Sequence, residues 1–215
     1  MTDTPIELWH AADTRSFRVL WALEEIGVGY TLHPLPFPPR AKAPDYLAVN
    51  PLGTVPAFRQ GAVLMLESVA IVQYLAQRYP EAGLALGISE PEFGAWLDWL
   101  HFGEAALTFP LAIVLRYTRF EPGRADQAAE DYGRWFGARL RRVEAGLEGR
   151  DWLCADRFTG ADISVGFALL LADFLGLAPR FGPNVTAYWQ RLQARPGFQA
   201  AKRAQGSSLA ELLAP

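Results

Sequence analysis

The segment from Asn50 to Pro56 reads NPLGTVP, and Glu67 and Ser68 follow it eleven residues further on. Its prolines and glycine exclude a helix there. A cis bond before Pro56 would turn the backbone N–H and C=O of Val55 towards solvent, where an extended peptide can pair with them. Ser68 precedes an apolar run, so we expect it to cap a helix whose N-terminus favours a carboxylate. Glu67 would favour an amine, and the three features predict a receptor for a small zwitterionic peptide.

The elements that would position these residues form a β-α-β unit followed by a hairpin and a helix. Apolar and turn patterns predict strands at residues 6–10, 30–33, 56–59 and 63–66, and helices at 16–26, 45–49 and 68–79. A loop with five prolines, residues 34–44, follows the second strand. This order is typical of a thioredoxin-like α/β module, which we place at residues 1–80.

The rest of the chain is predicted to be helical after a linker at residues 81–88. Helical spacing of apolar residues indicates helices at 90–119, which Pro110 would kink or break, and at 125–146 and 185–194. Thr159 and Asp162 form the pattern of a capping box at the start of a further helix. We expect an all-α domain over residues 89–215, with a loose tail from residue 207.

The motif Asn-Pro-Leu-Gly-Thr-Val-Pro-Ala-Phe, followed by Leu-Glu-Ser and a helix, resembles the glutathione-binding half of the cytosolic glutathione transferases. The cap at Thr159 is similar to one in the core of their helical domain. The resemblance implies that Val55, with Pro56, pairs with the cysteinyl part of glutathione. It also implies that Glu67 and Ser68 hold the γ-glutamyl end and that the protein is a homodimer.

A transferase of this kind needs a donor that stabilises the thiolate of glutathione, because roughly a few per cent of a free thiol is ionised at neutral pH. The family uses Tyr, Ser or Cys near the first helix, and this chain has neither Tyr nor Cys there. Similarity to bacterial relatives with Ser-Arg-Ser-Phe-Arg makes Thr14 the first candidate and Ser16 the second. A gapless comparison with the serine classes instead places Asp13 at this position. The alternative is that both hydroxyls only cap the helix.

The glycyl end of glutathione would also need a partner. Many relatives carry Lys or Gln where this chain has Thr54, and Arg40 and Lys42 would supply the positive charge instead. The alternative for Arg40 and Lys42 is that they are ordinary solvated surface residues. The resemblance further implies an electrophile pocket between the two halves. Its candidates, each with core packing as the alternative, are Phe102, Leu107, Phe109 and Tyr117.

The composition limits the classes of partner. The chain has 215 residues, 51% of them hydrophobic, and a net charge of −3. We therefore expect neither nucleic acid nor an anionic membrane as a partner. Cys154 is the only cysteine, which excludes an internal disulfide, and the N-terminus lacks the pattern of a signal peptide. Both features predict a cytoplasmic protein, with Cys154 as a buried filler. The three histidines are scattered, so we expect no metal.

The resemblance to the glutathione transferases implies an enzyme that conjugates reduced glutathione, as cosubstrate, to small hydrophobic electrophiles in detoxification. Two alternatives stay open. The same glutathione site would serve a peroxidase or an isomerase, and a non-catalytic binding protein would keep the fold. The identity of the second substrate is not readable from these residues.

Overall fold

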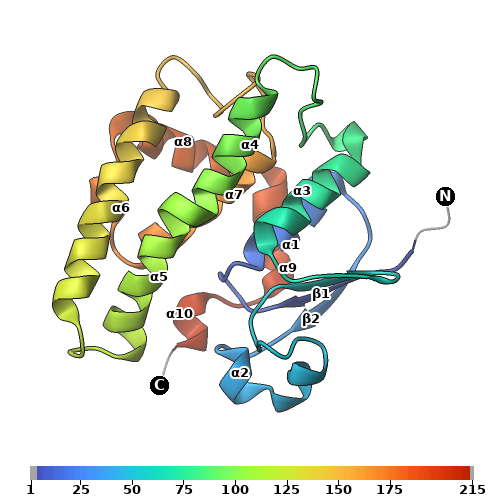
Figure 1. The fold of residues 1–215 in the computed structure, drawn as a ribbon, viewed down its shortest axis with the longest axis vertical. Coiled ribbons are helices and arrows are strands. Elements are labelled where there is room, and N and C mark those ends of the chain that lie inside the picture. Colours follow the sequence, from blue (N-terminus) through green and yellow to red (C-terminus); the bar gives the residue numbers. More distant parts are fainter. Residues whose placement is uncertain (1–3, 214–215) are drawn as a thin grey trace. The chain divides into compact units, whose positions relative to one another are not determined.

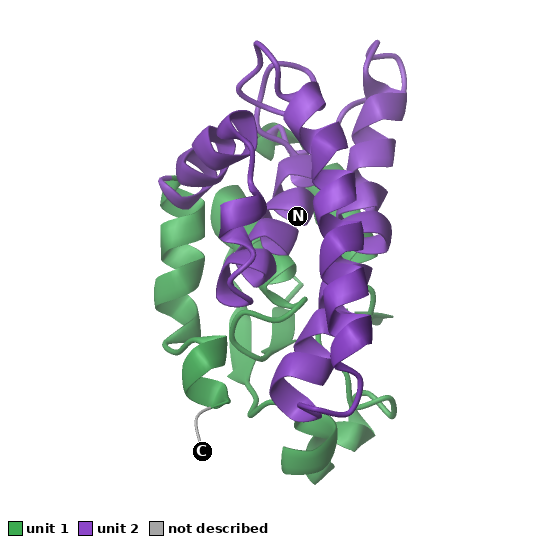
Figure 2. Cartoon of the chain, turned by 90° about the vertical axis from the view of Figure 1, so that its left-hand side faces the viewer, with its two compact units in different colours: residues 1–82, 195–215 green, residues 83–194 purple. Residues whose placement is uncertain are grey.

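The computed structural model describes residues 4–213, which divide into two compact units (Figure 2). Unit 1 comprises residues 1–82 together with 195–215, and unit 2 comprises residues 83–194. This division differs from the expected helical domain of residues 89–215, because the chain from Arg195 onward packs with its N-terminal part.

Unit 1 contains a four-stranded mixed sheet in the order β2-β1-β3-β4. Its strands are β1 (Ile6–His10), β2 (Thr31–Pro34), β3 (Ala57–Gln60) and β4 (Val63–Met65). β1 runs parallel to β2 and antiparallel to β3, and β3 is antiparallel to β4. Leu8 and Phe58 lie opposite each other in the sheet and are both fully buried. Trp9, one residue further along, belongs to a second cluster because neighbouring side chains in a strand point to opposite faces.

Helices cover both faces of this sheet. α1 (Phe17–Ile26) and α3 (Ser68–Arg78) pack together on one face, and α2 (Pro39–Lys42) lies on the other side (Figure 1). A 3-10 helix, Pro44–Ala48, follows α2, and a second, Pro80–Ala82, follows α3. α1 ends at Gly27, whose left-handed conformation (φ 74°) suits a residue without Cβ. The expected strands and helices of this module are confirmed, with boundaries that move by one or two residues.

The C-terminal segment of unit 1 departs from the prediction. α9 (Pro196–Gln205) packs against α1, with the Phe198 ring edge-on to Phe17 and Trp21. Pro196 is the first residue of α9, where its missing N–H costs no hydrogen bond. The expected loose tail is wrong in part, because α10 (Leu209–Leu212) follows with a capping box at Ser208.

Unit 2 is helical. Its helices are α4 (Phe93–Phe102), α5 (Phe109–Leu115), α6 (Asp126–Gly146), α7 (Gly160–Phe174) and α8 (Pro183–Gln193), with a 3-10 helix at Ala178–Arg180. Two π-helical segments, Gly103–Thr108 and Arg116–Phe120, adjoin α5. Pro110 is the second residue of α5, so the helical path continues through it after a π-helical turn rather than breaking.

The start of α7 carries a buried carboxylate, that of Asp162, with several hydrogen bonds. Thr159 caps α7, and the Asp162 side chain accepts from the Thr159 N–H at 2.8 Å, as the capping-box pattern predicts. The Asp162 carboxylate also accepts from the Leu153 N–H at 3.1 Å and the Tyr188 hydroxyl at 2.8 Å. These four residues, Leu153, Thr159, Asp162 and Tyr188, are called the Asp162 cluster below. Burial raises the pKa of Asp162 to about 6 despite these donors.

Candidate functional site

The turn of residues 50–56 is held from within by Asn50. The buried Asn50 side chain donates to the Thr54 carbonyl at 2.8 Å and accepts from the Leu52 N–H at 3.0 Å. The hydroxyl of Tyr46 donates to the same Thr54 carbonyl at 2.6 Å. These bonds satisfy the polar groups of the turn just before Val55, and they fix the backbone on which a peptide ligand would have to dock.

Val55 is placed to pair with an extended peptide. Its bond to Pro56 is cis, as expected. β3 begins at Ala57, so Val55 lies outside the sheet ladder, and neither its N–H nor its C=O makes a hydrogen bond to any residue that the structure describes. The Val55 side chain is buried in a cluster with Trp9, Ala11 and Tyr46. The side chain therefore anchors the residue while its backbone keeps a donor and an acceptor for a partner.

α3 begins without a side-chain cap, which corrects the expectation for Ser68. The N-cap residue is Glu67, which has extended backbone angles (φ −90°, ψ 112°), and Ser68 is the first helical residue. The first hydrogen bond of α3 runs from Ile71 N–H to the Glu67 carbonyl, as it does at any helix start. The N–H groups of the first turn are therefore left for an anion, while the exposed Glu67 carboxylate has no partner among residues 4–213.

Arg18 lies beside the N-terminus of α3, and it was not among the site residues predicted from the sequence. Its side chain is fully buried, and Nη1 donates to Ser68 Oγ at 3.2 Å. A buried guanidinium stays charged, so it adds a positive potential beside the N-terminus of α3. The signal in the sequence is a cation within the buried stretch of α1, where an unpaired charge would be costly.

Thr14 and Ser16 lie in one hydrogen-bonded group just before α1. Ser16 Oγ lies 2.9 Å from Thr14 Oγ1 and 2.8 Å from Nδ1 of His10. Ser16 Oγ also accepts from the Ala11 N–H at 3.2 Å, and Thr14 Oγ1 donates to the Ala11 carbonyl at 2.7 Å. Neither hydroxyl caps α1, because the N-cap residue Ser16 makes no side-chain cap bond. We call His10, Ala11, Thr14 and Ser16 the His10 cluster.

His10 was not predicted as part of this site. It is 1% exposed, and burial lowers the pKa of its imidazole to about 4, so the ring is neutral at pH 7. Gln205 and Asp13 lie near enough to favour the protonated ring, and Lys202 opposes it. Nδ1 faces Ser16, whereas Nε2 is buried without a hydrogen bond of good geometry to any described residue.

Asp13 is fixed by the C-terminal segment and is not free for a ligand. It adopts the left-handed region at φ 53°. Its carboxylate accepts from Lys202 Nζ at 2.7 Å, Gln205 Nε2 at 2.8 Å and the Leu209 N–H at 3.2 Å. Residues of α9 and α10 thus hold the loop that carries Thr14, and Asp13 supports the site rather than supplying its donor.

The candidates for the glycyl end of glutathione differ in position. Arg40 and Lys42 are both exposed in α2. A Cβ at Gly53, whose φ is +61°, would lie 2.9 Å from the Arg40 Cα, so the backbone of α2 touches the turn at Arg40. Thr54 is exposed, and the Asn50 side chain donates to both its carbonyl and its hydroxyl. Of the two basic residues, Arg40 is therefore the one whose backbone contacts the turn at Gly53.

The electrophile candidates all lie in unit 2 and differ in burial. Leu107 is fully buried, so its position is explained by core packing rather than by contact with an electrophile. Phe109 is 48% exposed and packs edge-on to Tyr132. Phe102 and Tyr117 are half-buried and lie under the guanidinium groups of Arg142 and Arg116 respectively.

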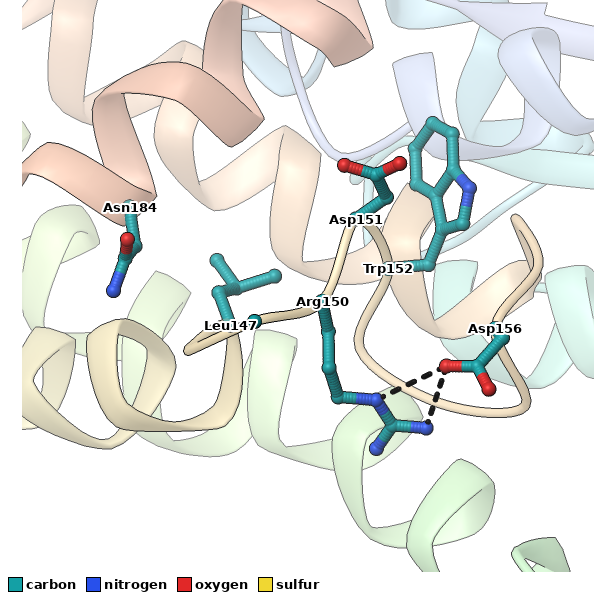
Figure 3. Close-up of a pocket in the computed structure, with 7 residues that line it drawn as sticks. Leu147, Arg150, Asp151, Trp152, Asp156 and Asn184 are labelled. Atoms are coloured by element: carbon teal, nitrogen blue, oxygen red, sulfur yellow. Dashed lines mark hydrogen bonds and ion pairs between the residues drawn. The ribbon is translucent and has the colours of Figure 1, made fainter.

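A separate surface cavity of about 470 Å³ lies in unit 2 and contains none of the predicted site residues (Figure 3). Arg150 contributes to the wall of the cavity. Its guanidinium donates to the carboxylates of Glu92 and Asp156. Cys154, nearby in the chain, is buried, and burial raises its pKa to about 11, which makes it a poor nucleophile.

In residues 4–213 we find no group of three or more His, Cys, Asp or Glu side chains arranged for a metal. None of the helices in that range combines the length and the hydropathy that a bilayer span requires.

Comparisons with known proteins agree with this geometry. Residues 14–83 match the family model of the glutathione S-transferase N-terminal domain, and residues 114–196 match that of the C-terminal domain. Glutathione S-transferase 3 of Zea mays is 34% identical over 194 residues, which cover 85% of this chain and 86% of that protein. The maleylacetoacetate isomerase of Pseudomonas aeruginosa is 32% identical over 198 residues, covering 87% of this chain and 91% of that protein. A sphingomonad glutathione S-transferase solved with glutathione superimposes with a TM-score of 0.82 at 25% identity, covering 94% of this chain and 100% of that one.

Proposed function

Because this chain belongs to the glutathione S-transferase family, we propose that it is a glutathione transferase that conjugates reduced glutathione to small hydrophobic electrophiles. The observation that carries the proposal is the unpaired backbone of Val55 beside an uncapped N-terminus of α3. A tripeptide with one backbone pair, one carboxylate and one ammonium group matches these features.

Each end of glutathione has a partner of the right chemistry in unit 1. The cysteinyl backbone pairs with Val55, next to Pro56. The γ-glutamyl carboxylate is held at the start of α3 by Ser68, with the positive potential of Arg18 behind it, and its ammonium group by Glu67. Arg40 meets the glycyl carboxylate, with Lys42 as a second cation on the same exposed helix. The relative bound with glutathione supports this class of ligand.

Thr14 is the residue that stabilises the thiolate. Ser16 has no exposed surface, whereas Thr14 is 8% exposed, so Thr14 reaches a ligand with less movement. The thiolate then attacks the electrophilic carbon, forming the S–C bond. The apolar side chains of Phe102, Phe109 and Tyr117 are our candidates for contacts with the electrophile. We further propose that the protein works as a cytoplasmic homodimer in detoxification, without a metal.

The first test is calorimetry with reduced glutathione at millimolar concentration, followed by an assay with an aryl halide. We expect binding and conjugation. Thr14→Val should raise the pKa of the bound thiol by about one unit, and so lower the rate at pH 6.5 about tenfold. No heat on titration would overturn the glutathione site, and an unchanged thiol pKa would overturn the role of Thr14.

The maleylacetoacetate isomerase among the relatives favours one alternative, an isomerase that uses the same glutathione site. Assays with a cis-enone, a hydroperoxide and an aryl halide separate isomerase, peroxidase and transferase. Binding of glutathione with no turnover in any of the three would leave a binding protein that retains the fold.

A further inference from the structure

Three buried side chains form a continuous hydrogen-bonded row that ends at Thr14. His10 Nδ1 lies 2.8 Å from Ser16 Oγ, and Ser16 Oγ lies 2.9 Å from Thr14 Oγ1. His10 and Ser16 are 1% and 0% exposed, so neither is placed to touch a ligand. Any effect of these two on chemistry must therefore pass through Thr14.

Each hydroxyl has one hydrogen, and Ser16 Oγ also lies 3.2 Å from the Ala11 carbonyl, so the row allows several hydrogen arrangements, two of which decide what Thr14 does. In the first, Thr14 donates to the Ala11 carbonyl and Ser16 donates to His10 Nδ1, which requires the ring proton on Nε2. In the second, His10 Nδ1–H donates to Ser16, Ser16 donates to Thr14, and the Thr14 hydrogen is released for an outside acceptor. The Ala11 carbonyl then still receives the Thr14 backbone N–H at 3.3 Å.

We propose that His10 is a positioning residue which, through Ser16, turns the Thr14 hydroxyl towards the thiolate of bound glutathione. The proposal rests on the proposed function, because it needs a thiolate as the outside acceptor. Bonds that run in one direction polarise one another, so a donation by His10 strengthens the final bond from Thr14. The bound thiolate then selects the Nδ1–H tautomer of an imidazole that otherwise populates both tautomers.

The surroundings of His10 suit such a balance. Nε2 has no hydrogen bond of good geometry, so neither tautomer is locked from that side. Gln205 lies nearby and favours a proton on the ring, and the oxygen of its carboxamide also accepts from the Asp13 N–H at 3.2 Å. The charged groups that act on His10 are Asp13 and Lys202, which are paired with each other at 2.7 Å. With those charges paired, the ring stays neutral and only its tautomer changes.

The test compares two variants of His10 in the full chain. His10→Leu removes the donor, whereas the amide nitrogen of His10→Asn reaches about the same place as Nδ1 and restores it. We expect His10→Leu to raise the pKa of the glutathione thiol, followed by thiolate absorbance, by about one unit and to lower kcat near pH 6.5 about tenfold. The KM for glutathione should change less than about twofold, since the residues that bind the peptide are untouched. His10→Asn should recover most of the rate, an outcome that lost packing alone does not produce.

A double-mutant cycle separates the relay from the proposed function. In a Thr14→Val background, His10→Leu should have no further effect on the thiol pKa. The hydroxyl through which His10 would act on the thiolate is then absent. If wild-type protein binds glutathione and lowers its thiol pKa but His10→Leu leaves both the pKa and kcat unchanged, the relay is wrong and the proposed function stands. If wild-type protein binds no glutathione, the proposed function fails first.

A second measurement covers the case in which His10→Leu does not fold. Nitrogen NMR of the wild-type protein with labelled histidine reports the tautomer, and variants of His33 and His101 identify the remaining signal. Glutathione should shift His10 towards Nδ1–H, and S-methylglutathione, which has no thiolate, should not. An Nε2–H tautomer in the free protein and in both complexes, with glutathione and with S-methylglutathione, would overturn the proposal.

Discussion

The His10 cluster of unit 1 and the Asp162 cluster of unit 2 are both buried and polar, and they are built in opposite ways. In the Asp162 cluster of unit 2, two backbone N–H groups and the Tyr188 hydroxyl all donate to one carboxylate. An ionised carboxylate can only accept, so the direction of each of these three bonds is fixed. In the His10 cluster of unit 1, two hydroxyls and an imidazole exchange the roles of donor and acceptor, and Nε2 has no bond of good geometry.

The difference separates a structural cluster from a responsive one. A fully satisfied group specifies a single local structure, and its loss costs stability. A cluster with an unused hydrogen-bonding group contributes less to stability, but a ligand can change the arrangement of its hydrogen bonds. Burial acts on both in the same sense, since it favours the neutral form of each: it raises the pKa of Asp162 to about 6 and lowers that of His10 to about 4.

The largest expected effect is the loss of Asp162. Asp162→Ala leaves the Leu153 and Thr159 N–H groups and the Tyr188 hydroxyl buried without an acceptor, so the free energy of unfolding should fall by about 3–5 kcal/mol. Urea unfolding measures this. Asp151→Ala, at an exposed ion pair with Arg191, is the control and should cost less than about 1 kcal/mol. A loss of similar size in both variants would remove the contrast between the clusters.

The pH dependence of stability should reveal the two clusters as opposing contributions. The folded pKa of Asp162, about 6, exceeds the ordinary 3.8, so the folded state binds more protons and this contribution falls as pH rises from about 4 to 6. The folded pKa of His10, about 4, lies below the ordinary 6.5, so its contribution rises with pH over about 4 to 6.5.

A matched variant separates these contributions. Between pH 4 and 6 the stability of Asp162→Asn relative to wild type should rise by about 2 kcal/mol, because the variant lacks the contribution that falls in wild type. Urea unfolding at several pH values measures the difference, in which the other carboxylates cancel. A difference that does not change with pH would mean that Asp162 ionises normally in the folded protein.

The caps of α7 and α10 offer a smaller contrast. Thr159→Ala removes a fully buried cap and should cost about 1–2 kcal/mol, whereas Ser208→Ala, at an exposed capping box on a four-residue helix, should cost about 0.5 kcal/mol. Thermal unfolding ranks the two variants. The reverse order would mean that α10 is held mainly by its cap rather than by the burial of Leu209.

The smallest expected effect is at the ion pair beside His10. Lys202→Met should cost about 1 kcal/mol or less, since the Lys202 side chain is 31% exposed. Because Lys202 opposes protonation of His10, the variant should also raise the pKa of that imidazole, which an NMR titration follows. Arg134→Met, at an exposed pair with Asp131, is the control that should change neither quantity.

Local signals predicted most of the fold. The strands around β1 and β3, the N-terminus of α3 and the cap of α7 all follow from neighbouring residues, and all are confirmed to within a residue or two. Pro196 shows the limit of such signals, because a proline stops one helix or starts the next, and the sequence does not distinguish the two. Ser68 shows another limit, since a serine before an apolar run fits both the N-cap and the first helical position, and here Glu67 is the N-cap.

The candidate site was predicted only where it is local. The turn at Val55 and the pair Glu67 and Ser68 stand close together in the chain. His10 and Arg18 were missed because each of their roles depends on a partner in another element. The bond between Asp13 and Gln205 joins residues 192 positions apart, and no spacing rule predicts it.

The return of residues 195–213 to unit 1 has a consequence for how the protein is made. The loop that carries Thr14 is synthesised early, yet the side chains that clamp its Asp13 leave the ribosome only after all of unit 2. Unit 2, being continuous in the chain, can collapse during translation, whereas the earlier half must wait for its closing helix. A released chain that ends at residue 194 should therefore protect unit 2 from protease while the first eighty residues are still cut.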